Sequence, residues 1–507
     1  MASKMIVIGA GPGGLAAALM LAGKGYEVDV YEKQPYVGGR NSSINLDGFT
    51  FDMGPTFLSM VHIAEEIFQS AGKNLHDYVD LKEIDDLYEL IFENESLHMT
   101  RNPEEMKKRI DEIAPGDGDG YARFMADTER KMDKLSPILQ SRMDRFHHYL
   151  SPRVLKALPD LTVTKSLYGV LSDYFMDERI KLAFTFQSKY LGMSPWECPG
   201  AFSILSYMEH AYGIYHPIGG VNQLSKAMAK AFEELGGRIH LGQGVKKLLH
   251  EGKKAKGILL ESGEKIEADE VIINGDFAHV MTNLLEEGVS KKFSKAKLSK
   301  KKFSCSTFMI YLGLDKIYDL PHHTILFAKD YKKNVEAITK TFDLSDDISI
   351  YIQNASVTDP TLAPAGKSAL YVLAPVPSNL SGISWEEKKE TFRRLILETV
   401  EKRTGFKDLE NHIVTEKIIS PLEWEKDIFV YKGATFNLGH QLSQMMVLRP
   451  HNKFDELDHC WLVGGGTHPG SGLPTILESA RITVNGIFKK DHLPQIKAGP
   501  GKRAGIG

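Results

Sequence analysis

The sequence predicts an α/β fold, and three patterns support this prediction. An apolar run at residues 5–8 leads into the motif Gly-x-Gly-x-x-Gly at residues 9–14, and a helix over residues 13–24 is expected to follow. A second apolar run ends in Glu32. Residues 460–487 repeat the order of strand, glycine-rich turn and helix. Together these patterns are typical of a Rossmann-like domain that binds a dinucleotide.

Each residue of the first motif has a physical reason to be there. Gly9 allows the tight turn after the strand, Gly11 lets the backbone approach a pyrophosphate, and Gly14 lets the helix pack closely on the strand. The helix N-terminus offers unpaired N–H groups and a positive dipole end to the phosphates. Glu32 stands where an acid accepts hydrogen bonds from a ribose hydroxyl.

The stretch of residues 5–25 could also be interpreted as a secretory signal, because Lys4 precedes it and three consecutive alanines lie within it. A signal needs a continuous apolar helix ahead of a small-residue cleavage site. Four glycines and Pro12 interrupt the stretch here, so no signal peptide is expected. The rest of the chain has no uninterrupted apolar run of about 18 residues, so no transmembrane helix is expected.

Two further glycine-rich segments are expected to help hold the nucleotide. Gly38-Gly39-Arg40 can add a backbone approach and a positive charge to the same diphosphate, although an ordinary glycine turn with a solvated arginine is the alternative. In the C-terminal segment Pro474 begins a helix, where its missing N–H would have been unpaired anyway. A strand–helix crossover without a ligand is the alternative for that segment, and the local pattern alone does not decide.

Composition restricts the class of protein. The 507 residues are too many for one ordinary core, so two domains are expected. A net charge of -4 gives no support for nucleic-acid binding. Three widely spaced cysteines fit a reducing, cytoplasmic compartment better than a disulfide framework. The pairs His147-His148 and His322-His323 lack companion carboxylates at metal-ligand spacing, so no metal site is expected.

These motifs, with VYEK and VGGR near the N-terminus and LVGGGTHPGSGLP near the C-terminus, resemble the FAD-dependent amine oxidase and phytoene desaturase superfamily. Within it the chain is similar to the bacterial carotenoid desaturases, above all the staphylococcal and bacillar 4,4'-diapophytoene (dehydrosqualene) desaturases. FTFDMGPT, FSCSTFMIYLG (303–313) and TLAPAGKSALYVL (361–373) carry this second resemblance. The likeness extends from about residue 5 to residue 490.

The resemblance implies that FAD is the cofactor. A valine in the superfamily pairs its backbone with the adenine ring, and Val245 is the matching position here. The expected FAD-binding residues are Gly9, Gly11, Gly13, Gly14, Glu32, Lys33, Gly39, Arg40, Val245, Gly465, Gly466, Gly472, Leu473 and Pro474.

The full expectation is an α/β fold in which a Rossmann-like FAD-binding domain accompanies a discontinuous α+β domain that binds the substrate and associates with a membrane. The FAD-binding domain is assembled from the two ends and a central piece, residues 1–72, 215–290 and 441–495. Residues 73–214 and 291–440 build the second domain. The tail at 496–507 has no core-forming residues and is expected to be disordered.

The resemblance also implies a reaction, in which a colourless linear isoprenoid is desaturated to a conjugated carotenoid by hydride transfer to flavin N5. The substrate would be 4,4'-diapophytoene or phytoene. A carotenoid terminal-methyl oxidase, a flavin amine oxidase and a non-enzymatic lipid-chaperoning relative are the alternatives, and the intact nucleotide motif disfavours the last. The sequence identifies neither a general base nor an oligomeric state. The candidates for catalysis are Thr467 and His468 in the flavin-facing turn, and Arg142, Asp144 and Arg145.

A stretch that mixes cations with bulky apolar residues suggests contact with a membrane. Basic amphipathic helices can lie among anionic lipid headgroups, although most such stretches are solvated helix faces. The hydrophobic substrate implied by the resemblance favours peripheral membrane association. The cations are Arg142, Arg145, Arg153, Lys156 and Lys165, among Phe146, Tyr149, Leu150, Leu155 and Leu158.

Overall fold

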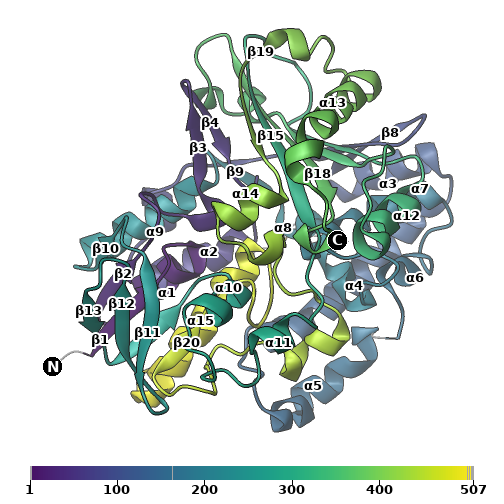
Figure 1. Ribbon diagram of the computed structural model, residues 1–507. Helices are drawn as coiled ribbons and strands as arrows, with labels where there is room; N and C mark the ends of the chain where they lie inside the picture. The colour runs from purple at the N-terminus through teal and green to yellow at the C-terminus, as the bar shows by residue number, and fades with distance from the viewer. Residues whose placement is uncertain (1–2, 163, 500, 502, 504–507) are drawn as a thin grey trace.

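The computed structural model describes residues 3–162, 164–499, 501 and 503 (Figure 1). One sheet has five parallel strands in the order β10-β2-β1-β14-β20. Its strands come from distant parts of the chain: β1 (Lys4–Ile8), β2 (Glu27–Tyr31), β10 (Arg238–His240), β14 (Glu270–Ile273) and β20 (Cys460–Leu462). The two ends of the chain and a central piece therefore share a sheet, while the domain boundaries themselves stay a prediction.

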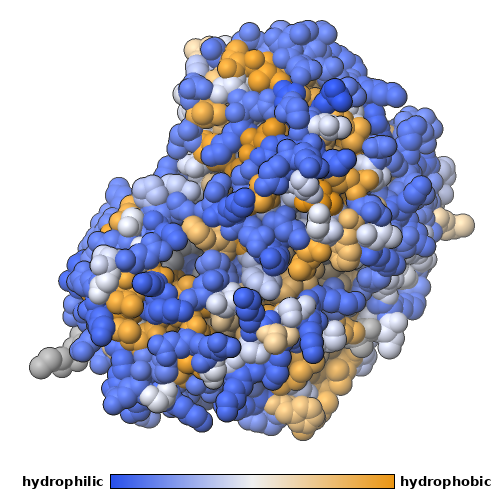
Figure 2. Space-filling model, viewed as in Figure 1, coloured by the Kyte–Doolittle hydropathy of each residue, from blue (hydrophilic) through white to orange (hydrophobic). Residues whose placement is uncertain are grey.

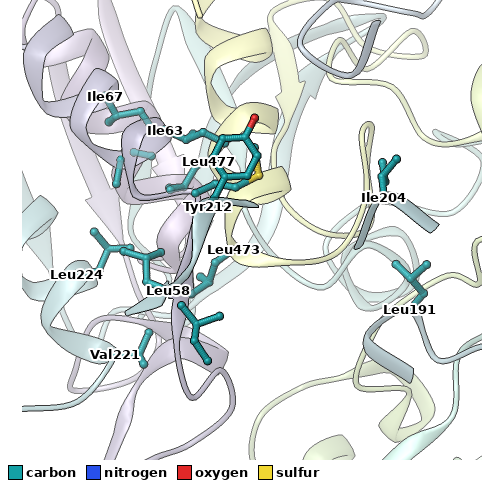
Figure 3. Packing of buried hydrophobic residues seen from close by; sticks show 14 of the residues in the cluster. Leu58, Ile63, Ile67, Leu191, Ile204, Tyr212, Val221, Leu224, Leu473 and Leu477 are labelled. Carbon is teal, nitrogen blue, oxygen red and sulfur yellow. The ribbon is translucent and has the colours of Figure 1, made fainter. Parts of the chain in front are cut away.

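Four helices pack together beside this sheet and share one hydrophobic core. Helix α1 (Pro12–Ala22) is buried along its whole length because α9 (Asn222–Glu234), α2 (Val61–Ser70) and α15 (Leu473–Lys490) all contact it. Figure 3 shows Leu477 of α15 beside Ile63 of α2. The first and last long helices of the chain thus lie against each other.

The glycine motif forms the predicted turn between β1 and α1. Gly9 has a φ of 96°, a left-handed value that glycine adopts without strain. A Cβ atom on Gly14 would lie 2.2 Å from the carbonyl oxygen of Gly9, so a side chain there would push α1 away from the strand end. The prediction of strand, turn and helix at the N-terminus is confirmed.

The second large sheet has seven strands in the order β19-β15-β18-β17-β16-β7-β8. All of its pairings are antiparallel except that of β16 with β7. Trp385 and Phe392 of α13 (Trp385–Arg403) pack against Phe308 of β15, so this helix covers one face. The strands are β7 (Asp86–Ile91), β8 (Ser96–Thr100), β15 (Ser306–Leu314), β16 (His323–Leu326), β17 (Ile350–Gln353), β18 (Ser368–Val376) and β19 (Ile413–Ile419).

Smaller elements complete the fold. The minor sheets pair β3 with β4, β9 with β5 and β6, and β12 with β11 and β13. Their strands are β3 (Ser43–Leu46), β4 (Phe49–Asp52), β5 (Leu58–Ser59), β6 (Leu81–Glu83), β9 (Ile214–Pro217), β11 (Val245–Glu251), β12 (Lys254–Leu260) and β13 (Lys265–Glu267). The other α-helices are α3 (Pro103–Ile113), α4 (Asp117–Leu139), α5 (Pro152–Ala157), α6 (Leu167–Leu171), α7 (Glu178–Ala183), α8 (Ile204–Tyr212), α10 (Phe277–Asn283), α11 (Lys295–Leu298), α12 (Tyr331–Glu336) and α14 (Pro421–Lys426).

The C-terminal tail differs from the expected disorder wherever the structure describes it. The Gly499 N–H donates to Glu66 at 2.8 Å, and Arg503 forms an ion pair with Asp133 at 2.6 Å. These contacts hold the tail against α2 and α4. The same prediction for residues 500, 502 and 504–507 falls outside the described residues.

Within the described part of the chain, every helix is too short or too polar to cross a bilayer.

We expect Gly14→Ala to lower the free energy of unfolding by about 1–3 kcal/mol, because its methyl group would press on the Gly9 carbonyl. Chemical denaturation monitored by circular dichroism measures this. The matched control is Gly169→Ala in α6, whose Cβ would lie no nearer than 3.3 Å to any neighbour and should change stability little. Equal stability of the two variants would contradict the close-packing role of Gly14.

Candidate active site

One cavity of about 720 Å³ connects the glycine motif with the seven-stranded sheet. Its first end is lined by most of the residues expected to hold the dinucleotide: Gly9, Gly11, Glu32, Lys33, Gly39, Arg40, Val245, Gly465, Gly472, Leu473 and Pro474. Its other end is lined by bulky apolar side chains, among them Phe186, Leu205, Met208, Met309, Ile325, Ile350 and Leu373. A polar cradle and an apolar chamber are thus continuous.

Glu32 lies at the C-terminal end of β2 with its side chain turned into the glycine motif. Its carboxylate accepts hydrogen bonds from the backbone N–H groups of Ala10 and Gln34, both at 2.8 Å. Burial raises the pKa of Glu32 above its ordinary value, and these N–H donors partly offset that effect. The carboxylate therefore sits buried beside the turn, where the sequence predicts a ribose contact.

Two cations stand at the same end of the cavity. The Arg40 guanidinium donates to the carbonyl of Thr435 at 3.1 Å and lies 3.5 Å from the carboxylate of Asp276. Lys33 lies 4.0 Å from the centre of the Phe429 ring and pairs with Glu261 at 3.0 Å. Both side chains are held in place while they line the cavity.

Three of the expected cofactor residues do not line the cavity and instead allow close packing around it. A Cβ on Gly13 would lie 2.6 Å from a methyl group of Val463, and one on Gly466 would lie 2.5 Å from the Cβ of Phe277. Gly14 approaches the Gly9 carbonyl in the same way. Because these three glycines have no side chain, the segments around the cavity can pack closely, and this packing gives the cavity its shape.

The residues of the cradle fit a flavin dinucleotide. The N-terminus of α1, an eleven-residue helix, begins next to Gly11, where backbone N–H groups and the helix dipole favour a diphosphate. The turn of Gly464 to Gly472 lines the same cavity and leads into α15. Glycines keep both approaches free of side chains, so a flat, extended ligand can lie between them.

The structure turns the side chains of Thr467 and His468 away from the cavity. The Thr467 hydroxyl donates to the carbonyl of Gly464 at 2.8 Å and contacts the hydroxyl of Ser479 at 3.0 Å. His468 lies 3.0 Å from the carbonyl of Ser141, and burial lowers its pKa to about 4. Their expected position at the cofactor edge is therefore corrected, because both side chains are used to tie the turn to its surroundings.

The candidates Arg142, Asp144 and Arg145 also lie outside the cavity lining. Arg142 forms an ion pair with the buried carboxylate of Asp144, which His148 also approaches at 3.4 Å. Arg145 is exposed and lies 3.4 Å from Asp455. These contacts explain the charges as local ion pairs outside the cavity, although the segment lies beside the turn, where His468 approaches the carbonyl of Ser141.

Several polar residues in the apolar chamber carry no pattern that the sequence reveals. Glu209 of α8 is buried and accepts hydrogen bonds from the Tyr88 hydroxyl at 2.6 Å and the Gln187 amide at 2.9 Å. Burial lowers the pKa of Lys189 to about 7. Both line the cavity. They stand singly among apolar residues in the sequence, so only the three-dimensional structure places them at a site.

Comparison with known proteins places the chain in a family. The family model for flavin-containing amine oxidoreductases matches residues 12–402. A 4,4'-diapophytoene desaturase (4,4'-diapolycopene-forming) of Methylomonas sp. is 49% identical over 489 residues, which is 96% of each chain. The chain belongs to the carotenoid desaturases of the flavin-containing amine oxidoreductases.

A second relative agrees with that placement, and a solved structure agrees with the fold. The 4,4'-diapophytoene desaturase (4,4'-diaponeurosporene-forming) of Staphylococcus aureus strain Newman is 31% identical over 499 residues, covering 96% of this chain and 99% of the relative. A crystal structure of an oxidoreductase from Methanosarcina mazei superimposes with a TM-score of 0.65, covering 96% of this chain and 100% of the other. At 19% identity, this structure supports the fold alone. The sequence-based identification of the family and of a flavin enzyme is confirmed.

We expect Glu32→Ala to weaken flavin binding by about 10- to 100-fold, since hydrogen bonds to a charged group contribute about 1.5–3 kcal/mol. The retained flavin can be measured by its absorbance after purification, and its Kd by fluorescence titration. Glu27→Ala is the control, because Glu27 begins the same strand but is exposed and pairs with Arg238. A fully yellow Glu32→Ala protein would exclude the ribose contact.

Proposed function

We propose that the protein is an FAD-dependent desaturase that converts 4,4'-diapophytoene into the conjugated carotenoid 4,4'-diapolycopene. The observation that carries this proposal is the single cavity in which a dinucleotide cradle opens into an apolar chamber. The most similar of the relatives described above is named for this substrate and product. Bound in the cradle, FAD would accept a hydride from the substrate.

The chain's own contribution is to bind, orient and keep dry a hydrocarbon that has no polar group. Each buried CH2 group contributes about 0.8 kcal/mol, so a long isoprenoid gains its affinity from apolar walls rather than from hydrogen bonds. Side chains of α8 and of strands β15, β16, β17 and β18 supply these walls. The glycine motif, Glu32 and Arg40 would hold the dinucleotide at the other end of the cavity.

The alternatives that share this fold have less support. A carotenoid terminal-methyl oxidase would use the same motifs, but the relatives at 31% and 49% identity are named as desaturases. An amine oxidase needs a polar entry and a recognition site for a cation, whereas the far end of this cavity is dominated by aliphatic and aromatic side chains. Desaturation therefore remains the proposal.

Co-expression with a source of colourless precursor tests this function. We expect 4,4'-diapophytoene to give yellow-to-red pigment whose mass falls by two hydrogens for each double bond introduced, measured by chromatography with mass spectrometry. Parallel cultures that make phytoene show whether the chamber also accepts the longer chain. Pigment that forms only from an already conjugated precursor, with added oxygen, would overturn desaturation in favour of the terminal-methyl oxidase.

We also propose that the protein binds peripherally to a membrane, on the cytoplasmic side, through the segment at 146–158. Phe146 is 69% exposed and Leu150 is 57% exposed, and Leu155 and Leu158 are nearly half exposed. Arg153 and Lys156 are exposed in the same segment. Figure 2 shows hydrophobic residues at the lower edge of the molecule, where Figure 1 places α5. Such a face could enter the headgroup layer in which the substrate is dissolved.

Replacing Phe146 and Leu150 together by serine should lower binding to vesicles of anionic phospholipid at least tenfold, because each large apolar side chain contributes about 1.5–3 kcal/mol when buried. Sedimentation with vesicles measures the bound fraction. Met176→Ser is the control, since Met176 is 90% exposed but lies outside this segment. Unchanged binding of the double variant would exclude the segment as the membrane contact.

A further inference from the structure

A series of buried and half-buried polar side chains leads from the wall of the cavity toward the protein surface, joined by hydrogen bonds except between His323 and His322, whose rings are in contact. Thr56 and Tyr351 both line the cavity, and their hydroxyl oxygens are 2.5 Å apart. On its other side the Tyr351 hydroxyl lies 2.7 Å from Nδ1 of His323. A hydroxyl that faces the substrate chamber is thus hydrogen-bonded to an imidazole behind the wall.

The neighbouring imidazole continues this path outward. The rings of His323 and His322 have centroids 4.3 Å apart, and Nδ1 of His322 lies 2.7 Å from the hydroxyl of Thr358. Thr358 is half-buried, and the preceding residue in the chain, Val357, is 38% exposed. Thr358 therefore lies close to the solvent. The path therefore begins at the cavity and ends near the surface.

The two histidines also have ring nitrogens that the protein does not satisfy. His323 is 1% exposed and His322 is 5% exposed, and Nε2 of each has no hydrogen-bond partner among the described residues. Buried polar atoms in native proteins are nearly always hydrogen-bonded, so a pair of open imidazole nitrogens needs a functional or structural reason. Each of these nitrogens can take or release a proton, directly or through a shared water.

We propose that Thr56, Tyr351, His323, His322 and Thr358 form a relay that carries the proton of the desaturation step out of the apolar chamber. The proposal rests on the desaturase function proposed above. Each new double bond requires two C–H bonds to break: one hydrogen leaves with both electrons of its bond to the flavin, and the other leaves as H⁺. A hydrocarbon chamber offers that proton few acceptors, and Tyr351 is an acceptor at its wall.

The electrostatics favour passage of a proton over its storage. Burial, together with the charge that His216 can carry, lowers the pKa of His323 to about 3, and burial lowers the pKa of His322 well below its usual value. Burial opposes ionisation of Asp359, but its hydrogen bonds, first that with His216, outweigh this and lower its pKa to about 2. Each ring is therefore neutral, with Nδ1 hydrogen-bonded and Nε2 open, so it can accept a proton at one nitrogen and release another from the other without retaining a charge.

A metal site is not the explanation for this cluster. Among the residues that the structure describes, no group of histidine, cysteine and carboxylate side chains has the arrangement that would hold a metal ion. His216 is instead paired with Asp359 at 3.0 Å, and both side chains are fully buried. The His216 side chain is therefore engaged with this carboxylate behind the two neutral rings.

Tyr351→Phe and His323→Gln test the relay in flavin-loaded enzyme. We expect single-turnover reduction of the flavin by 4,4'-diapophytoene to slow at least tenfold in each variant, since a positioned proton acceptor contributes about 10²- to 10⁴-fold to a rate. We also expect the solvent deuterium isotope effect on that rate to decrease, because Tyr351 and His323 supply the exchangeable protons that move as the substrate proton leaves. A merely structural role would leave the isotope effect unchanged.

Tyr311→Phe is the matched control. Tyr311 is a buried tyrosine of the same sheet whose hydroxyl donates to the carbonyl of Met53 at 2.6 Å, and it does not line the cavity. In the Tyr311→Phe variant, the substrate should reduce the flavin at a rate within twofold of the wild-type rate. Wild-type rates in Tyr351→Phe and His323→Gln, or slower rates with an unchanged isotope effect, would overturn the relay while leaving desaturation intact.

A second readout needs neither substrate nor turnover. In protein labelled with ¹⁵N-histidine, the Nδ1 resonance of His323 should show a strong hydrogen bond in the wild type and lose it in Tyr351→Phe, while Tyr311→Phe leaves it unchanged. An unaltered His323 resonance in Tyr351→Phe would overturn the first link of the relay. If the wild-type flavin is not reduced by any isoprenoid, the proposed function fails, and the relay falls with it.

Discussion

The close approach of the glycine motif to Asn274 is the constraint on which the rest of the structure depends. The Asn274 amide donates to the Gly9 carbonyl at 3.2 Å, and a Cβ on Gly9 would lie 2.5 Å from the Asn274 carbonyl oxygen. Only a residue without a side chain fits at position 9, where the turn passes Asn274 at the end of β14. The same turn directs the N-terminus of α1 toward the cavity. Because α1 packs against α15, the glycine-rich turn that precedes α15 also lies at the cavity.

The parts of the site that could be predicted from the sequence are those fixed by local geometry. The spacing of Gly9, Gly11 and Gly14, and the distance along the chain to Glu32, follow from one strand, one helix and the next strand. Most of the expected cofactor residues line the cavity for this reason. The order of the seven-stranded sheet could not be predicted, because β7 pairs with β16, which lies more than 200 positions further along the chain.

Side-chain direction was the second limit on prediction. Thr467 and His468 stand in the turn that lines the cavity, so their sequence position suggested a role at the cofactor edge. A turn has no fixed period, however, and the backbone of Gly465 faces the cavity while these two side chains face Ser479 and Ser141. Nearness along the chain identifies the segment of a site but not which of its atoms face the ligand.

The polar residues behind the chamber wall are best understood from the energetics of burial. A hydrocarbon ligand cannot hydrogen-bond to Lys189, Glu209 or Tyr351, and buried polar groups without partners cost about 1–3 kcal/mol each. The chain instead surrounds Glu209 with Tyr88 and Gln187, and Tyr351 with Thr56 and His323. Binding alone does not require such networks, whereas a reaction that releases a proton into an apolar space can use one.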